Sequence, residues 1–459
     1  MFNIPPKEQK VNSNRKFVIV SQDTSGEGWA KMLVSGSAGR GNPREEHNTE
    51  VIFSLALKDD EEDIEQIKKV GEGIFECIPF DEIWKNRSKY KDYIFIFDQN
   101  HNWEKAEQLR IEGFMVFGGL QLSDMMEHDR DFGISLIEKA GLDTPETQEF
   151  TGKDDGLEFL DENYDRAWVF KPDEPDGKSW VTTCPDHDND EKANREIYNF
   201  LKSQSNATPY ILQERVKGVE INVEFFVYKG TPFFAQANFE CKRKYNGDYG
   251  KMIGCAQDTC FVIPLESKIL KDTLWKLVKL PEFKDYTGFL DLNLIVADNK
   301  YYFLEFCARF GYNSHPNLFL SLSLSPFSEI MSDWVLGDIK EFGKHFRAGY
   351  GASITCWIDD LVTGLPLSFD DMTDESRFYP YDTYEEDGET YLAGYSNEVG
   401  VIVAHDYDLK SACEEAVSKY KRVHYPGKCG RTDLAETNYM TNPLERLTAC
   451  KEMGLFEAK

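Results

Sequence analysis

Short apolar runs with turn residues between them mark the beginning of the chain. Lys16–Val20, Tyr93–Phe97 and Phe114–Phe117 each predict a buried strand, and Trp103–Ile111 predicts a helix between the last two. A strand, a helix and a strand within about 25 residues are typical of a parallel βαβ unit. The pattern therefore predicts an open α/β sheet in the N-terminal part.

The turns after two of these strands are candidate ligand-binding loops. Ligands of open α/β sheets bind beyond the carboxyl ends of the strands. Ser21–Gly28 and Asp98–Asn102 follow two of the strands directly, so we expect them to share one rim. Further along, Asp124–Ala140 has an apolar side and ends before Gly141, a helix-stop residue, so we expect one helix there.

From about Ala167 the pattern becomes rich in strands. The turn residues Lys229-Gly230 and Asp298-Asn299 predict two hairpins. The predicted strands lie in AWVFKP, YILQERV, GVEINVEFFVYKG, TPFFAQANFE and GFLDLNLIVADNKYYFLEFCARFG.

A third region begins after about residue 345. GASITCWI and Val399–His405 predict strands, and Asp408–Tyr420 predicts an amphipathic helix. The acidic runs at 59–63 and 186–191 are expected to be solvated surface loops. The apolar face of the helix consists of Leu409, Ala412, Cys413, Ala416 and Tyr420.

Composition limits the partners of the protein. The 459 residues are 41% hydrophobic and 14% aromatic, enough for a large core, and the net charge of -29 disfavours nucleic acid and anionic membranes. No apolar run reaches the 18 or so residues of a membrane span, and the polar N-terminus is unlike a signal peptide. Ten scattered cysteines without a C-x-x-C pair indicate reduced thiols. We expect a cytoplasmic protein.

The predicted hairpin at 288–311 carries the most informative chemistry. Alternation along the strand places Asp291 and Asn293 on one face, and the returning strand brings Glu305 and then Arg309. Carboxylate and amide oxygens can hold Mg²⁺, and a guanidinium can neutralise a phosphoryl group. Asp is the better ligand, so we rank Asp291 before Asn293. Taken alone, an ordinary hairpin with one acidic residue per strand explains the same pattern.

Two further segments could contact a nucleotide. Lys171 ends a buried strand, where its charge needs an anion such as a phosphate, and Lys178 lies in the turn that follows. After the next strand, Gln213–Val216 could offer free backbone groups to an adenine, and Glu220 could accept from ribose hydroxyls. Each segment alone is equally well explained by a snorkelling lysine or an ordinary strand end.

In collinear order, from about residue 15 to 435, these segments resemble the ATP-grasp superfamily and, more narrowly, phosphoribosylamine–glycine ligase, also called glycinamide ribonucleotide synthetase. FLEFCARFG is similar to the metal motif of that family, ILQERVKGVEINVEFFV to its adenine and ribose segment, and AWVFKPDEPDGKSW to its phosphate-covering strand and loop. FECKRKYNGDYGKMIGC is similar to its substrate stretch, and HYPGKCGRTDL to its terminal signature.

The resemblance implies a set of roles for individual residues. It implies ATP and Mg²⁺ as cofactors, with Mn²⁺ as an alternative metal, and an acyl-phosphate route that joins a carboxylate to an amine. For the family these substrates are glycine and phosphoribosylamine, in purine biosynthesis. The implied residues are Arg130, Lys171, Lys178, Glu214, Val216 and Glu220 for ATP, Glu305, Asp291 and Asn293 for the metal, Arg309, Lys242 and Arg243 for catalysis, and Asp98, Asp248, Arg431 and Asp433 for substrates.

The chain also departs from the family pattern. Cys307 replaces the asparagine of the metal motif, the segment from Tyr312 to His315 replaces D-P-E-T, the phosphate loop is poor in glycine, and SQDTSGEGWA replaces the N-terminal glycine-rich loop. The departures spare Lys171 and Glu305 and fall on positions that select the substrates. We therefore keep three hypotheses: phosphoribosylamine–glycine ligase, a ligase of the same build for another acid and amine, and a non-catalytic nucleotide-binding relative.

The resemblance implies a multidomain ATP-grasp fold of mixed α/β and α+β class, with an N-terminal open parallel α/β domain and a C-terminal closing domain. We expect an N-terminal substrate domain at 15–120, an ATP-grasp domain at 121–345 with a lid at about 146–215, a C-terminal domain at 346–440 and a tail at 441–459. A monomer or homodimer is expected. A dinucleotide oxidoreductase is disfavoured because the first turn lacks G-x-G-x-x-G. Since a nucleotide must bind within an acidic chain, we expect a locally basic cleft.

Overall fold

The computed structural model describes residues 15–35, 49–57, 64–172, 189–204, 209–371, 376–436 and 442–458. Two large sheets and two small ones organise these residues. No helix within them is both long and apolar enough to cross a membrane.

The first sheet is parallel, as the βαβ pattern predicts. Its strand order is β3-β2-β1-β4-β5, and each neighbouring pair is parallel. The Ser21 hydroxyl donates to Asp98 Oδ2 (2.5 Å), which confirms that the turns after β1 and β4 share one rim. The elements are β1 (Lys16–Ser21), α1 (Gly26–Ser35), β2 (Glu50–Leu55), α2 (Glu65–Lys69), β3 (Glu76–Cys77), α3 (Phe80–Lys85), β4 (Ile94–Phe97), α4 (Trp103–Ile111) and β5 (Met115–Phe117).

The second sheet has nine strands and forms the centre of the molecule. Its order is β13-β12-β9-β10-β11-β14-β19-β16, with β21 beside β14, and its pairs are antiparallel. Both predicted hairpin turns are present, because Lys229, Asp298 and Asn299 adopt positive φ between paired strands. The strands are β9 (Val219–Tyr228), β10 (Thr231–Tyr245), β11 (Tyr249–Val262), β12 (Gly288–Ala297), β13 (Lys300–Phe306), β14 (Tyr350–Ile358), β16 (Phe378–Pro380), β19 (Glu398–Asp406) and β21 (Lys428–Cys429).

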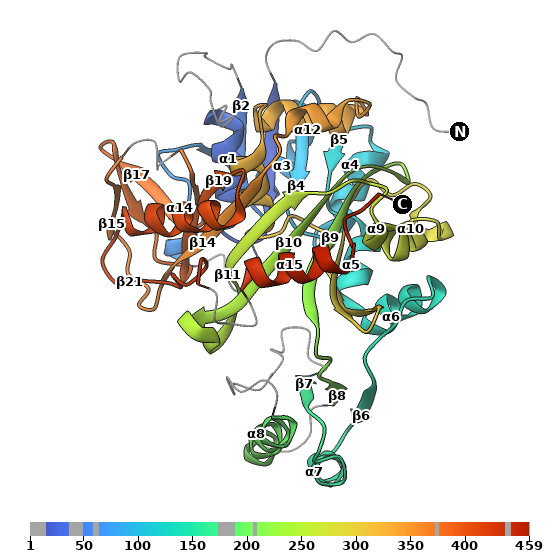
Figure 1. The fold of residues 1–459 in the computed structure, drawn as a ribbon. Helices are drawn as coiled ribbons and strands as arrows, with labels where there is room; N and C mark the ends of the chain where they lie inside the picture. The colour runs from blue at the N-terminus through green and yellow to red at the C-terminus, as the bar shows by residue number, and fades with distance from the viewer. Residues whose placement is uncertain are drawn as a thin grey trace.

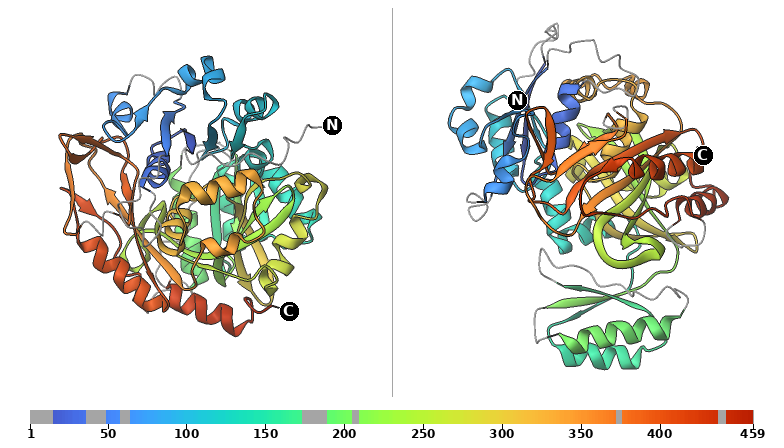
Figure 2. Two further views of the ribbon diagram at one scale, coloured as in Figure 1. Left: turned by 90° about the horizontal axis from the view of Figure 1, so that it is seen from above. Right: turned by 90° about the vertical axis from the view of Figure 1, so that its left-hand side faces the viewer.

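A three-stranded sheet with two helices forms a separate layer. Its order is β6-β8-β7, and a small core that includes Trp168, Leu160 and Ile197 fills the space between sheet and helices. Figure 1 and the right-hand view of Figure 2 show this layer projecting from the rest of the molecule. Its elements are β6 (Thr147–Phe150), α7 (Lys153–Glu162), β7 (Trp168–Pro172), α8 (Asp190–Ser203) and β8 (Tyr210–Glu214).

The segment predicted as one helix at 124–140 is instead two helices. α5 (Gln121–His128) ends at Asp129, and α6 (Arg130–Lys139) begins after it. Asp129 has an extended backbone, and its carboxylate accepts from the Phe132 N–H (3.0 Å). The prediction was wrong because an N-capping aspartate starts a new helix where the apolar pattern continues. The acidic run at 186–191 is also partly helical, since Asp190 and Glu191 open α8.

The C-terminal region contributes four strands, β14, β16, β19 and β21, to the nine-stranded sheet and packs a helix against it. In α14 (Leu409–Lys421) all five residues of the predicted apolar face are buried. The predicted tail contains a further helix, α15 (Pro443–Glu452), in contact with β9. A four-stranded sheet, β17-β18-β15-β20, completes the region. The remaining elements are α9 (Lys268–Asp272), α10 (Leu274–Leu277), α11 (Ser314–Asn317), α12 (Phe327–Leu336), β15 (Pro366–Phe369), β17 (Thr383–Glu386), β18 (Glu389–Leu392) and β20 (Val423–His424).

Candidate active site

A cavity of about 570 Å³ lies where the three-stranded sheet meets the nine-stranded sheet. Its walls come from β7, the segment between β8 and β9, strands β9 to β13, the loop after β13, and α15. The volume falls within the range of small-molecule sites. Segments far apart in the sequence therefore supply one chamber.

Most of the residues proposed from sequence line this cavity. Ten of the sixteen do so, although they come from six strands and the segments that adjoin them, so the collinear motifs converge in space. They are Lys171, Glu214, Val216, Glu220, Lys242, Arg243, Asp248, Asp291, Glu305 and Arg309.

The β12–β13 hairpin places the candidate metal ligands together. Asn293 pairs directly with Glu305, next to a bulge in the register, and its amide donates to Glu305 Oε1 (3.0 Å). Asp291 Oδ1 and Asn293 Oδ1 are buried and have no hydrogen-bond partner among the described residues. Unpartnered buried oxygens beside a reachable carboxylate fit the all-oxygen coordination of Mg²⁺.

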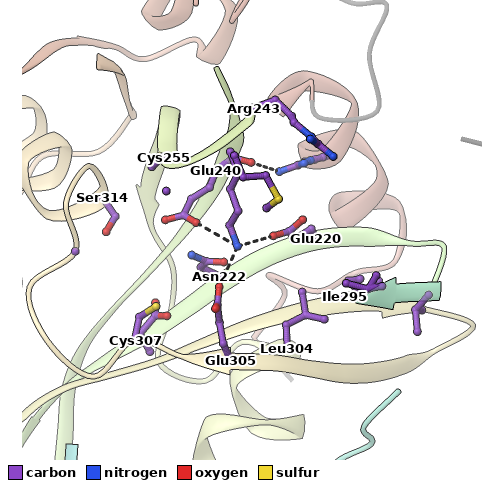
Figure 3. A pocket seen from close by; sticks show the side chains of 18 of the residues that line it. Glu220, Asn222, Glu240, Arg243, Cys255, Ile295, Leu304, Glu305, Cys307 and Ser314 are labelled. Carbon is purple, nitrogen blue, oxygen red and sulfur yellow. Dashed lines mark hydrogen bonds and ion pairs between the residues drawn. The ribbon is translucent and has the colours of Figure 1, made fainter. Parts of the chain in front are cut away.

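Lys242 lies at the centre of the charged cluster. Its ammonium group is 3.0 Å from Glu305 Oε1, 3.2 Å from Glu220 Oε1 and 3.9 Å from Glu240 Oε2. Figure 3 shows the three labelled carboxylates converging on this one nitrogen. The lysine thus neutralises carboxylates from three different strands.

The cluster shifts the pKa of its members in opposite directions. The charge of Lys242 lowers the pKa of Glu305 to about 2, so Glu305 is a carboxylate at any physiological pH. Burial, followed by the neighbouring Glu224, raises the pKa of Asp291 well above its ordinary value. Burial also lowers the pKa of Lys171, although Glu305 partly opposes this effect. A bound cation or phosphate would favour the charged forms of Asp291 and Lys171.

The cavity is not predominantly basic, so the prediction of a basic cleft was wrong. Seven acidic and seven basic side chains line it, and Lys217, Lys242 and Arg309 among the cations form ion pairs with carboxylates. The acidic ones are Glu214, Glu220, Glu224, Glu240, Asp248, Asp291 and Glu305, and the basic ones are Lys171, Arg215, Lys217, Lys242, Arg243, Arg309 and Arg446. The cavity is nonetheless far less acidic than a chain of net charge -29.

Two other proposed residues lie next to the cavity lining. Arg130 donates from Nη2 to the carbonyl oxygen of Pro172 (3.3 Å), directly after Lys171. Asn293 contacts Glu305, as described above. Lys178 lies outside the described residues.

Three proposed substrate residues do not line the cavity. Asp98 is buried beneath the rim, where Ser21 and Ser25 donate to its Oδ2 (2.5 and 3.3 Å). Arg431 and Asp433 are buried and paired (2.5 Å). They hold the β10–β11 turn, since Arg431 is 2.6 Å from Asp248. The structure thus places Arg431 and Asp433 behind Asp248, as support for it.

Several lining residues escaped the sequence analysis. His315 Nε2 is 2.9 Å from Glu224 Oε2, and His315 Nδ1 accepts from the Gly311 N–H (2.6 Å). Because Nδ1 is the acceptor, His315 donates to Glu224 through Nε2 and fixes the loop after β13. Glu240 and Arg446 were also missed. The Asn442-Pro443 helix start was the available signal for Arg446.

The rim of the parallel sheet reaches the end of the cavity through Tyr312. Asp23 Oδ2 accepts from the Tyr312 hydroxyl (2.9 Å) and from the Gln99 amide (2.6 Å). Arg309 stacks over the Tyr312 ring at 4.9 Å. The carboxylate of Asp23 therefore lies at this end of the chamber, in contact with a residue of its lining.

Residues 128–314 match the family model described as "Phosphoribosylglycinamide synthetase, ATP-grasp (A) domain". A phosphoribosylamine–glycine ligase of Leptospira interrogans is 24% identical over 333 residues, which cover 70% of this chain and 77% of that protein. The crystal structure of phosphoribosylamine–glycine ligase from Thermotoga maritima superposes with a TM-score of 0.59 at 19% identity, covering 91% and 99% of the two chains. Biotin carboxylase from Campylobacter jejuni, in complex with an ATP ligand, gives 0.60 at 12% identity, covering 94% and 98%.

These similarities confirm the ATP-grasp fold predicted from the sequence. The solved structures share the fold across different reactions, so the fold alone does not specify the acid and the amine. The choice of acid and amine therefore depends on the residues in the cavity.

Proposed function

We propose that the chain is an ATP-grasp ligase whose cavity joins a carboxylic acid to an amine through an acyl phosphate. The observation that carries the proposal is the arrangement around Glu305. The candidate metal ligands Asp291 and Glu305 share one chamber with the cations Lys171 and Arg309, and Asn293 donates to Glu305 from beside it. A chamber with both acidic and basic side chains suits a metal–triphosphate complex, because the acidic groups bind the metal and the basic groups bind the phosphates.

The reaction has two steps. A carboxylate oxygen attacks the γ-phosphorus of ATP, the bond from that phosphorus to the β,γ-bridging oxygen breaks, and ADP leaves. The amine nitrogen then attacks the acyl carbon, the bond from that carbon to the phosphate oxygen breaks, and the amine loses a proton as the amide forms. Mg²⁺ or Mn²⁺, when bound, would neutralise part of the phosphate charge.

The proposed roles of the protein residues follow from their places. Lys171, near the end of β7, and Arg130, which donates to Pro172 from the start of α6, would hold the phosphates in line. Lys178 would join them by the family resemblance alone. Glu214, Val216 and Glu220 line the side where β8 leads into β9, which we assign to the adenosine. In this structure the Glu214 carboxylate is 2.9 Å from Arg166 Nη2, and both residues belong to the three-stranded layer that contains β7.

The transferred phosphoryl group would meet the other cations of the chamber. Arg309 stands 3.9 Å from Glu127, a buried partner that keeps its guanidinium in place. Burial raises the pKa of Glu127 to about 7, although the charge of Arg309 opposes that rise. Lys242 and Arg243 face the same space from β10, and Asp248 faces it from the adjoining turn.

The three-stranded layer would close over this space and exclude water. An acyl phosphate in a wet site is hydrolysed, so closure protects the intermediate. The layer contributes Val169 and Lys171 to the cavity wall while keeping its own core. This separation would let it move as a unit.

Glycine and phosphoribosylamine, as in the named relatives, are the first substrates to test, and they would place the protein in purine biosynthesis in the cytoplasm. One observation favours a different pair. The carboxylate of Asp23 contacts Tyr312 at the rim end of the cavity, where a phosphate of the amine substrate would meet like charge. A ligase of the same build for an unphosphorylated amine is therefore the second candidate.

The test is phosphate release from ATP with panels of acids and amines, glycine with phosphoribosylamine among them. We expect release that requires Mg²⁺, an acid and an amine together, and that falls at least about a thousandfold in Glu305→Gln. A matched Glu149→Gln variant, on the exposed β6, should keep full activity. Unchanged nucleotide binding together with no turnover for any pair would overturn the ligase proposal in favour of a non-catalytic nucleotide-binding protein.

A further inference from the structure

A second cluster of metal-binding side chains lies outside the cavity. His101, Asp124 and His128 each offer one ligand atom, and these three atoms all lie within 4.8 Å of one another. The two imidazole rings are 4.6 Å apart, and His128 Nε2 is 3.7 Å from Asp124 Oδ1. We propose that His101, Asp124 and His128 bind a transition-metal dication such as Zn²⁺ or Co²⁺.

The donor set selects this class of metal. Two imidazole nitrogens and one carboxylate oxygen suit Zn²⁺, Co²⁺ and Ni²⁺, whereas Mg²⁺ and Ca²⁺ prefer oxygen ligands alone. Metal–ligand bonds of about 2.0–2.2 Å place neighbouring donor atoms roughly 3.3 Å apart around a tetrahedral ion. Both imidazoles are exposed, so side-chain rotation alone can bring the three atoms to that spacing. Solvent can supply the fourth ligand.

The backbone already holds the three donors in place. Asp124 and His128 are one turn apart on α5, a spacing that puts them on the same helix face. His101 follows Asn100, whose amide donates to the carbonyl oxygen of Ala308 (3.2 Å) and so anchors the loop after β4.

A second triad, Glu329, Asp333 and His345, serves as a contrast. His345 is fully buried, with Nδ1 2.8 Å from the Ser325 hydroxyl and Nε2 3.1 Å from Asp333 Oδ2. Both of its nitrogens are therefore used in hydrogen bonds, and a metal would have to break them. The imidazoles of the first triad are instead exposed, so their side chains can rotate toward an ion.

A metal at this site would connect two parts of the protein. The loop of His101 belongs to the parallel sheet, and its Gln99 donates to the Tyr312 hydroxyl (2.9 Å). Helix α5 carries Glu127, the partner of Arg309. The ion would thus link the two elements that support the Arg309–Tyr312 segment, and we expect it to stabilise their contact.

The experiment is a Co²⁺ titration of the full chain in excess Mg²⁺, which occupies oxygen sites without competing for imidazoles. We expect about one equivalent of Co²⁺ with visible d–d absorption and no thiolate charge-transfer band. His101→Ala and His128→Ala should each weaken binding about tenfold or more. His424→Ala is the matched control, because His424 forms another exposed pair with Asp370 (2.8 Å).

A second readout uses Zn²⁺ and thermal unfolding. Zn²⁺ should raise the Tm of the wild type and of His424→Ala, but not of a His101→Ala/His128→Ala double variant. Circular dichroism of the metal-free variants establishes that they fold. Equal Co²⁺ affinity of wild type and double variant, no binding at all, or a thiolate band from cysteine ligation would each overturn the proposal.

Discussion

At the scale of single residues, Lys242 holds the site together. Its ammonium group lies within 3.9 Å of carboxylate oxygens of Glu220, Glu240 and Glu305. We predict that Lys242→Met raises the affinity for Mn²⁺ in the absence of nucleotide about tenfold, because the freed carboxylates become available to the ion. Isothermal titration with Mn²⁺ measures the effect.

The control is Lys217→Met. Lys217 also lines the cavity, but its ion pair is with Asp190 on α8 (3.0 Å), so its loss should leave Mn²⁺ affinity unchanged. A Lys242→Met variant that binds Mn²⁺ no better than wild type would show that the lysine does not compete for these carboxylates.

His315 is the second residue with a testable role. Its two nitrogens bridge Glu224 and the Gly311 backbone, and the side chain is 1% exposed. We predict that His315→Ala lowers the free energy of unfolding by about 3 kcal/mol, because a buried carboxylate loses a hydrogen-bond partner. Urea denaturation measures this loss, and the exposed His424→Ala should change stability by less than about 0.5 kcal/mol. Equal effects of the two substitutions would contradict the bridging role.

The same residues mark the limit of prediction at this scale. Alternation along one hairpin correctly put Asp291, Asn293 and Glu305 near one another. The contacts of Lys242 with three carboxylates depend on the register of four strands, β9, β10, β12 and β13. The sequence does not give that register. The prediction of a basic cleft therefore counted the basic residues without the acidic residues that lie beside them.

At the scale of elements, the periodic spacing of apolar residues predicted which helices and strands exist better than it predicted where they begin and end. The N-terminal βαβ unit, both hairpins and the buried face of α14 match the structure because each repeats a simple spacing. The break at Asp129 and the helix at 443–452 depend on single capping residues, which a periodic pattern does not register.

The three-stranded layer is the element whose core can be tested separately. A Cβ at Gly156, in α7, would lie 1.9 Å from the Tyr210 hydroxyl oxygen, so Gly156→Ala must displace the buried Tyr210 side chain of β8 from its place against α7. We predict faster amide hydrogen exchange across α7, α8 and β8 and weaker ATP binding, with the nine-stranded sheet unaffected. Gly152→Ala, where the nearest atom is 3.4 Å away, is the control. Uniform exchange changes over the whole molecule would contradict an independent layer.

At the scale of the whole molecule, the acidic surface is accompanied by acids buried inside. Burial raises the pKa of Glu27 and of Glu398 to about 8 and that of Asp258 to about 7. Glu27 links the N-terminal helix α1 to strand β17 of the C-terminal region. Its carboxylate accepts from the N–H (2.8 Å) and the hydroxyl of Thr383. These groups add little charge to the folded state near neutral pH, so the folded protein is less negative than its sequence implies.

These buried acids determine how stability depends on pH. The folded protein keeps a proton on Glu27 between its unfolded pKa near 4.5 and its folded pKa of about 8, whereas the unfolded chain releases it. The free energy of unfolding should therefore fall as the pH rises from 5.5 to 8. Glu27→Gln mimics the protonated acid, so relative to wild type it should gain up to about 3 kcal/mol across this range. The control is Glu112→Gln, because the Arg87 hydrogen bond lowers the pKa of Glu112 to about 2 and its contribution is constant above pH 5. Urea denaturation at each pH measures the slopes, and parallel curves for wild type and Glu27→Gln would contradict the assignment.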